Sequence, residues 1–150
     1  EAGLFDGLKN AYLKTTEFGW EIDPVGFRGT IREIYSRYHL PMLVTENGLG
    51  AYDKLTEDGK VHDPYRIEYL RKHIEQIQLA ITDDCEMMGY CPWSAIDLIS
   101  THEGMVKRYG FIYVDRDEFD LKTMDRCRKD SFYWYKKVIA TNGADLSDEC

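Results

Sequence analysis

The chain has 150 residues, of which 43% are hydrophobic and 13% aromatic, and this length and composition fit one modest globular domain. Its formal net charge of −8 argues against a nucleic-acid partner, because general affinity for nucleic acid depends on clustered Lys and Arg. Its apolar runs all fall short of the roughly 20 residues that a membrane-spanning helix needs, so we expect no membrane partner either.

The N-terminal part of the chain predicts a helix followed by a buried strand. Asp23-Pro24 is typical of a helix start, since a capping side chain stands before a proline in the first turn. Four hydrophobic residues follow at helical spacing: Phe27, Ile31, Ile34 and Tyr38. Residues 40–45 then form a short apolar run of the kind buried in a parallel sheet, and the run ends at the polar Glu46.

The middle of the chain predicts a second helix and a second strand. A polar loop over 52–62 precedes Pro64, where we expect the helix to begin. Its apolar residues recur at steps of three and four: Ile67, Leu70, Ile74, Ile77 and Ile81. The next strand is expected over 87–95. Because the nitrogen of Pro92 carries no hydrogen to donate, we expect a bulge or a strand end there.

The last part of the chain completes an α/β pattern. Residues 110–115 are expected to be extended, and a final helix is expected to end at Asn142-Gly143, a pair that favours a C-terminal cap. One side of that helix carries Phe132, Tyr135, Val138 and Ile139. Helices that alternate with strands predict parallel strands. Two parallel strands alone make a poor domain, so we expect residues 1–150 to be an incomplete part of one larger domain, with strand edges that favour a homo-oligomer.

The four cysteines give no sign of a disulfide framework or a metal site. They are Cys85, Cys91, Cys127 and Cys150, and no two of them form a CxxC pair. Free thiols in a reducing compartment explain this spacing most simply, so we expect a cytoplasmic protein. The four histidines are scattered without metal-ligand spacing, and we expect neither a metal nor another cofactor.

Glu46 is the first candidate for chemistry, because it follows an apolar strand directly. In a β/α barrel, polar residues at the C-terminal ends of strands face the active site. A lone strand-end glutamate is also a common surface residue, so its surroundings in the sequence must decide.

Residues 44–50 (VTENGLG) resemble the nucleophile signature of family 1 glycoside hydrolases. Residues 19–27 (GWEIDPVGF) are similar to the family segment that leads into that strand, and residues 89–97 (GYCPWSAID) to the last barrel strand. Residues 108–115 and 129–135 resemble its closing segments. The matches occur in the family's order between about residues 17 and 143. The resemblance implies the C-terminal portion of a (β/α)8 barrel, with its last two parallel strands and their helices.

The resemblance also implies a retaining mechanism, with Glu46 as the nucleophile and Trp93 in contact with the sugar. A retaining enzyme needs two carboxyl groups about 5 Å apart, one to attack the anomeric carbon and one to protonate the leaving oxygen. In the family, the second carboxyl belongs to an Asn-Glu-Pro motif, and this tripeptide does not occur in the 150 residues. We therefore expect these residues alone to be inactive. For Trp93 the alternative is a core tryptophan on a barrel strand.

A further resemblance concerns a sugar phosphate. Ordinary β-glucosidases of the family have a Glu-Trp pair where this chain has Ser100 and Thr101, and a glutamate there would repel a 6-phosphate. Ser100, Lys107 and Tyr109 form a Ser-x6-Lys-x-Tyr arrangement that resembles the phosphate-binding loop of members acting on 6-phosphosugars. A lysine is a compact cation, and the two hydroxyl groups can donate hydrogen bonds to phosphate oxygens. The alternative is a solvated basic loop with a packed tyrosine.

The sequence thus predicts a 6-phospho-β-glucosidase whose substrate is a phosphorylated β-glucoside. Phosphogalactosidases of the family tend to have a tryptophan at the position of Thr101, so its absence favours a gluco substrate. The alternatives are a 6-phospho-β-galactosidase, or a non-catalytic sugar-phosphate-binding or assembly fragment derived from such an enzyme.

Overall fold

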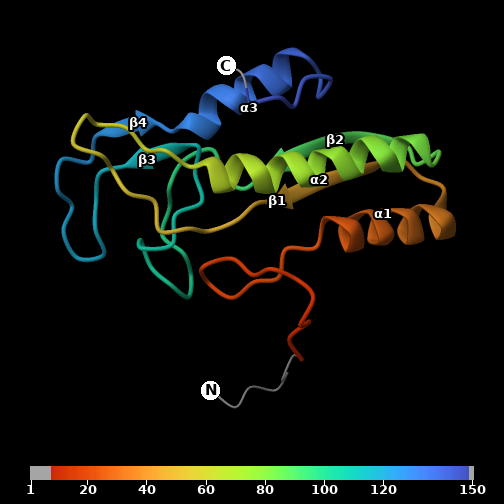
Figure 1. Ribbon diagram of the computed structural model, residues 1–150, viewed down its shortest axis with the longest axis horizontal. Coiled ribbons are helices and arrows are strands. Elements are labelled where there is room, and N and C mark those ends of the chain that lie inside the picture. Colours follow the sequence, from red (N-terminus) through yellow and green to blue (C-terminus); the bar gives the residue numbers. More distant parts are fainter. Residues whose placement is uncertain (1–7, 149–150) are drawn as a thin grey trace.

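The computed structural model describes residues 8–148, in which helices and strands alternate along the chain (Figure 1). The elements are α1 (Pro24–Tyr38), β1 (Met42–Asn47), α2 (Pro64–Thr82), β2 (Met87–Pro92), β3 (Ile112–Val114), β4 (Arg126–Arg128) and α3 (Asp130–Ala140). In the view of Figure 1, α2 runs along β1 and β2 and lies between α1 and α3. The predicted α/β order is confirmed.

The strands form one parallel pair and one antiparallel pair. β1 and β2 are parallel neighbours, as predicted. β2 ends at Pro92, one of the two outcomes expected at that proline, and so stops three residues short of the predicted range 87–95. β3 pairs with β4 in an antiparallel ladder. The sequence did not predict β4, because three residues rich in arginine carry no alternating apolar pattern.

The start and end of α1 follow from local chemistry. Asp23 accepts a hydrogen bond from the backbone N–H of Gly26 at 2.8 Å, which caps the helix before Pro24. The helix ends at His39, whose φ of 49° lies in the left-handed region and turns the chain toward β1. Among residues 8–148, no helix is both long enough and apolar enough to cross a bilayer.

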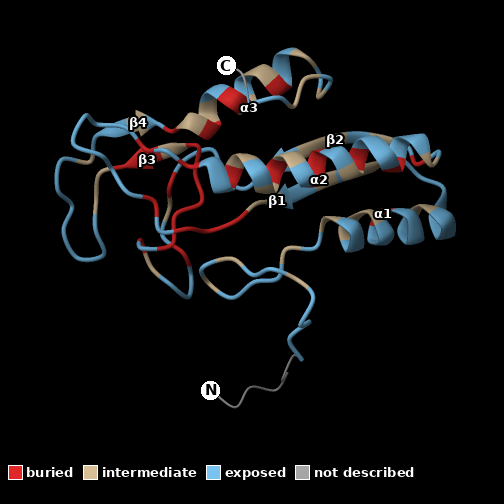
Figure 2. Ribbon diagram, in the orientation of Figure 1, coloured by how far each residue is buried: buried red, intermediate tan, exposed pale blue. Residues whose placement is uncertain are grey.

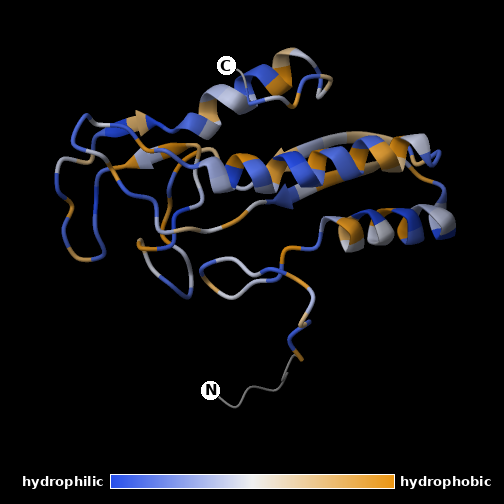
Figure 3. Cartoon of the chain, viewed as in Figure 1, coloured by the Kyte–Doolittle hydropathy of each residue, from blue (hydrophilic) through white to orange (hydrophobic). Residues whose placement is uncertain are grey.

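The core consists of two apolar clusters that share α2. One joins α2 to α3 and contains Leu70, Ile74, Phe111, Trp134 and Val138. The other joins α2 to α1 and contains Ile31, Ile77, Ala80 and Cys85. Buried residues recur along α2 in Figure 2, and apolar residues alternate with polar ones along it in Figure 3. Each helix thus buries one stripe and exposes the other.

The buried stripes differ in part from the predicted ones. Ile81 and Ile139 are 52% and 66% exposed, although both fit the predicted helical stripes. Trp134 is fully buried instead, since α3 turns it toward α2. Arg66 is also buried, on the face of α2 where the pattern predicts only apolar side chains.

Arg66 belongs to a buried ion network that joins the loops on one side of the molecule. It consists of three cations and three carboxylates: Arg66, Arg108, Lys129, Asp53, Asp63 and Asp97. Arg66 reaches Asp53 at 2.7 Å and Asp63 at 2.9 Å. Lys129 reaches Asp97 at 2.7 Å and also bonds to Asp53. Because the charges balance, each ion has a partner that offsets its loss of water.

Candidate active site

Glu46 and Trp93 lie at neighbouring strand ends of the parallel pair. Glu46 is in β1, and Trp93 follows β2 directly. The backbone N–H of Trp93 donates a hydrogen bond to the carbonyl oxygen of Asn47 at 2.8 Å. The carboxyl ends of parallel strands meet at one edge, so the structure brings the predicted nucleophile and the predicted sugar contact to that edge.

The carboxylate of Glu46 is exposed and, within residues 8–148, has no hydrogen bond. A nucleophile must be able to reach a carbon atom of the substrate, and an exposed side chain without a partner meets that requirement. The structure thus leaves the predicted nucleophile without a hydrogen-bond partner among residues 8–148.

Trp93 connects the strand ends to the predicted phosphate loop. Its side chain is 40% exposed, and its ring meets the ring of Tyr109 edge-on, with the centroids 6.5 Å apart. The peptide bond between Trp93 and Ser94 is cis. The hydroxyl of Ser94 donates to the carbonyl oxygen of Ile96 at 2.7 Å, so the segment after Trp93 is held against its own backbone.

Ser100, Lys107 and Tyr109 come together in one buried loop. The hydroxyl of Tyr109 donates to the hydroxyl oxygen of Ser100 at 3.2 Å. The Lys107 ammonium lies 5.6 Å from the centre of the Tyr109 ring. All three residues are less than 9% exposed, and Lys107 is only 3% exposed. The structure thus differs from the alternative of a solvated basic loop.

Two aromatic residues that the sequence analysis did not select complete the surroundings of Lys107. Its ammonium lies 3.7 Å from the centre of the Trp20 ring and 4.8 Å from that of Phe18. Aromatic faces attract cations, so these rings stabilise the charge without neutralising it. The contacts span about ninety positions of sequence, and no local pattern could have predicted them.

Lys107 differs from the other buried cations in having no anion beside it. Arg66, Arg108 and Lys129 are each paired with aspartates, whereas the Lys107 ammonium forms no ion pair with any residue between 8 and 148. A cation removed from water without an anion costs free energy. An anionic ligand would offset that cost.

The backbone around Lys107 is fixed on two sides. Arg108 and Ala51 exchange two backbone hydrogen bonds of 3.0 Å, which ties the loop to the segment after β1. On the other side, Gly104 has a φ of +65° in a tight turn, and the Glu118 carboxylate accepts a hydrogen bond from the backbone N–H of Met105. The loop is therefore shaped before any ligand arrives.

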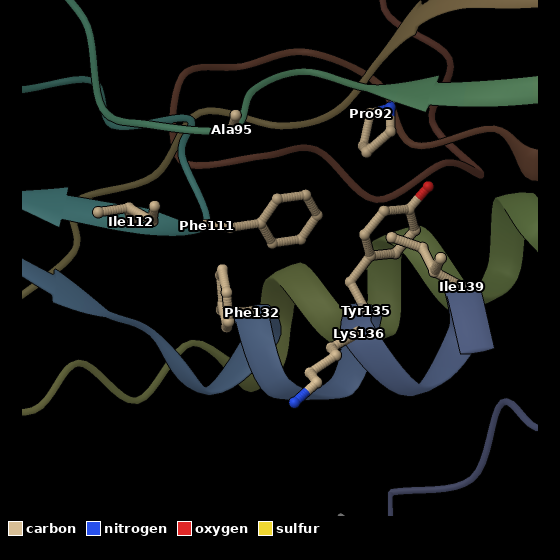
Figure 4. Close-up of a pocket in the computed structure, with 8 residues that line it drawn as sticks. All are labelled: Pro92, Ala95, Phe111, Ile112, Phe132, Tyr135, Lys136 and Ile139. Carbon is tan, nitrogen blue, oxygen red and sulfur yellow. The ribbon is translucent and has the colours of Figure 1, made fainter.

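An apolar hollow lies outside the predicted site. It has a volume of about 410 Å³, lies between the end of β2, β3 and α3, and is lined by Pro92, Ala95, Phe111, Ile112, Phe132, Tyr135, Lys136 and Ile139. In Figure 4, the ring of Phe111, from the segment just before β3, lies beside the ring of Tyr135 from α3. None of the predicted sugar-binding residues lines this hollow. Among the described residues, no three His, Cys, Asp or Glu side chains gather as metal ligands.

Comparisons with known proteins identify the family to which the chain is similar. Residues 3–144 match the model of glycosyl hydrolase family 1. The chain is 52% identical to the aryl-phospho-β-D-glucosidase BglA of Bacillus subtilis over 96% of its length, and 50% identical to the 6-phospho-β-glucosidase AscB of Escherichia coli over 97%. It spans about 30% of the length of these relatives.

A solved structure gives the same result for the fold. The family 1 β-glucosidase of Thermotoga maritima superposes with a TM-score of 0.83 and 38% sequence identity. The superposition covers 91% of this chain and 30% of that enzyme. The arrangement of helices and strands described above is therefore one part of a larger known fold.

Proposed function

The chain belongs to glycosyl hydrolase family 1 and has the fold of a C-terminal portion of a (β/α)8 barrel; from that premise we propose that the whole protein is a retaining 6-phospho-β-glucosidase. It would hydrolyse a 6-phospho-β-D-glucoside to glucose 6-phosphate and an aglycone. The observation that carries this proposal is the buried Lys107 ammonium without an anion, next to the hydroxyl groups of Ser100 and Tyr109.

In the proposed reaction, the Glu46 carboxylate attacks the anomeric carbon. A bond forms from a carboxylate oxygen to that carbon as the bond to the aglycone oxygen breaks, which gives a glycosyl-enzyme. The departing oxygen takes a proton from the acid/base glutamate of the family's Asn-Glu-Pro motif, which the 150 residues do not include. Water then attacks the same carbon, gives its proton to that second carboxylate and releases Glu46.

The phosphate would bind to the loop that carries Ser100, Lys107 and Tyr109. The ammonium group supplies the opposite charge, and the two hydroxyl groups can donate hydrogen bonds to phosphate oxygens. Trp93, which meets the Tyr109 ring edge-on, would then contact the sugar ring between the phosphate and Glu46.

The relatives support a gluco rather than a galacto substrate. The names of the two curated relatives above specify phospho-β-glucosidases, and this chain has Thr101 where the family resemblance puts tryptophan in phosphogalactosidases. A role as a non-catalytic sugar-phosphate-binding or assembly fragment is less favoured, because such a protein has no need of Glu46. Residues 1–150 alone should not turn over substrate, since they include one of the two catalytic carboxylates.

Replacement of Lys107 tests the proposal. In the whole protein, Lys107→Ala should lower kcat/KM for an aryl 6-phospho-β-glucoside by about 30- to 5,000-fold, the effect of removing one partner of a buried charge pair. The kcat/KM for the unphosphorylated aryl β-glucoside should change by less than about threefold, since no phosphate is present for Lys107 to bind.

Lys54→Ala is the matched control, because Lys54 is an exposed lysine in the loop after β1. It should leave both substrates unaffected. Equal losses on both substrates in Lys107→Ala would show that Lys107 supports the fold rather than the phosphate.

A further inference from the structure

The strand segment that carries Glu46 is not held by regular sheet pairing. In the parallel ladder Val44 lies opposite Tyr90, and Asn47 lies opposite Pro92. Two steps along β2 are therefore matched by three along β1, with an irregularity between Val44 and Asn47. Such a bulge re-aims side chains and leaves the extra residue without ladder hydrogen bonds. Glu46 lies inside this irregular stretch.

The next residue, Asn47, is fixed through both ends of its amide group. The amide oxygen accepts a hydrogen bond from the Tyr90 hydroxyl of β2 at 2.7 Å. The amide nitrogen donates to the Tyr69 hydroxyl of α2 at 3.3 Å. A strand residue and a helix residue thus hold one side chain from two directions, at the last pair of the parallel ladder.

The backbone of Asn47 also sets the position of Trp93. Its carbonyl oxygen accepts the 2.8 Å hydrogen bond from the Trp93 N–H. The following Gly48 packs so closely on the Trp93 backbone that a Cβ atom there would lie 2.0 Å from the Trp93 carbonyl oxygen. One residue therefore links the strand end of Glu46 to the backbone of the predicted sugar contact.

We propose that Asn47, held by Tyr69 and Tyr90, is a positioning residue that fixes Glu46 relative to the sugar bound at Trp93. This inference rests on the proposed role of Glu46 as nucleophile. Asn47 would not touch the substrate. Its side chain would restrain the bulged strand end, so that the carboxylate oxygen stays at attacking distance from the anomeric carbon. Attack is sensitive to such placement, since an error of about 1 Å can cost about 10²-fold in rate.

The two tyrosines are suited to a permanent restraint. Both side chains are partly buried, and burial raises the pKa of Tyr69 and of Tyr90 above the usual value for tyrosine. They stay protonated at the pH where the enzyme would act, so the Tyr90 hydroxyl remains a donor to Asn47. The Tyr90 backbone oxygen is in turn contacted by the Tyr135 hydroxyl at 3.4 Å.

The experiment measures the first chemical step in the whole protein. With a dinitrophenyl 6-phospho-β-glucoside, the bond from Glu46 to the anomeric carbon forms as dinitrophenolate leaves, and no proton donor is needed. Asn47→Leu should slow this burst by about 10²-fold and Tyr90→Phe by about 10-fold. The inhibition constant for glucose 6-phosphate should change by less than about threefold in both variants, because Lys107 and Trp93 still hold the product.

Tyr135→Phe is the matched control, since it removes a hydroxyl from the same cluster without removing a bond to Asn47. It should change the burst rate by less than about twofold. The losses from Asn47→Leu and Tyr90→Phe should not add in the double variant, because both remove the same hydrogen bond.

Equal burst rates in Tyr90→Phe and Tyr135→Phe would overturn the positioning role, and so would a loss in burst rate matched by an equal loss in glucose 6-phosphate binding. If the unaltered protein released no dinitrophenolate from this substrate, or if Glu46→Gln released it at the unaltered rate, the proposed function itself would be wrong and this inference with it. A normal, Glu46-dependent burst combined with an unaffected Tyr90→Phe would refute the positioning role alone.

Discussion

The strand end of Glu46 and the loop of Lys107 are built in opposite ways. The Glu46 carboxylate is exposed and forms no hydrogen bond with the described residues. Lys107 is 3% exposed and enclosed by aromatic rings. Arg108, the next residue, is buried and donates to Asp97 and to the backbone oxygen of Val114. In the first region, the neighbouring Asn47 is held by two side-chain hydrogen bonds. In the second region, Lys107 and Arg108 are themselves buried.

The difference fits the roles proposed for the two residues, Glu46 as a reactive group and Lys107 as a binding group. A nucleophile must reach a carbon atom of the substrate, so its own partners within the fold have to be few. A charged binding group gains most when its surroundings are preformed and water is excluded, because little reorganisation is then needed on binding. The described residues provide such preformed surroundings for Lys107, because the rings of Phe18 and Trp20 enclose its ammonium group.

Replacement of Glu46 gives the largest expected effect and separates chemistry from stability. Glu46→Gln in the whole protein should lower kcat by about 10⁴-fold or more, since an amide is a far weaker nucleophile than a carboxylate. The free energy of unfolding should change by less than about 0.5 kcal/mol, because the side chain is exposed. Steady-state kinetics and urea denaturation measure the two quantities. Turnover close to that of the unaltered protein would contradict the assignment of Glu46.

Replacement of Lys129 should instead lower the free energy of unfolding. Lys129 is fully buried and bonds to both Asp53 and Asp97, so Lys129→Met removes one partner from each buried carboxylate. Removal of a buried ionic partner costs about 3–5 kcal/mol of stability. Lys136→Met, on the exposed side of α3, is the control and should cost less than about 0.5 kcal/mol. Similar unfolding free energies for the two variants would show that the network does not hold the loops.

The sequence predicts the helices and strands with apolar patterns well, but it does not predict the buried ion network. The helices that begin at Pro24 and Pro64 carry caps and periodic apolar residues, and both were predicted close to their observed bounds. The predicted strand before Glu46 begins two residues early, because Leu40 and Pro41 continue the apolar run but lie outside the ladder.

Buried charges could not be predicted, because a charge in a helix normally indicates a solvated face. Arg66 is three positions from Asp63, yet its other partner Asp53 lies in a loop, and Lys129 reaches two separate loops. The predicted phosphate residues depended on family resemblance, and the aromatic contacts of Lys107 with Phe18 and Trp20 required the fold. Local sequence patterns do not show which residues far apart in the chain will contact one another.

Mild acid gives the smallest expected effect. It tests whether the contributions of His73 and Asp63 to stability change with pH in opposite directions. His73 of α2 is 3% exposed and stacks on the ring of Tyr69, with the centroids 4.0 Å apart. Tyr69 is the residue whose hydroxyl accepts the hydrogen bond from Asn47. Its Nδ1 hydrogen is donated to the Tyr69 carbonyl oxygen at 2.7 Å. Burial lowers the pKa of His73, and the bond to Tyr69 and the charge of Asp23 only partly oppose that shift. In the ion network, burial instead raises the pKa of Asp63.

The signs follow from which state binds more protons. The folded state binds a proton at His73 less readily than the unfolded state, so the stability that His73 contributes is complete above its unfolded pKa of about 6.5 and is lost as the pH falls toward the lower folded value. Asp63 binds a proton more readily when folded, so acid does not remove its contribution. We therefore expect the fall in Tm between about pH 7 and pH 5 to be smaller in His73→Phe than in the unaltered protein. His102→Phe, in an exposed loop, should retain the full fall. An equal fall in all three proteins would place the acid-sensitive group outside the helices that support Asn47.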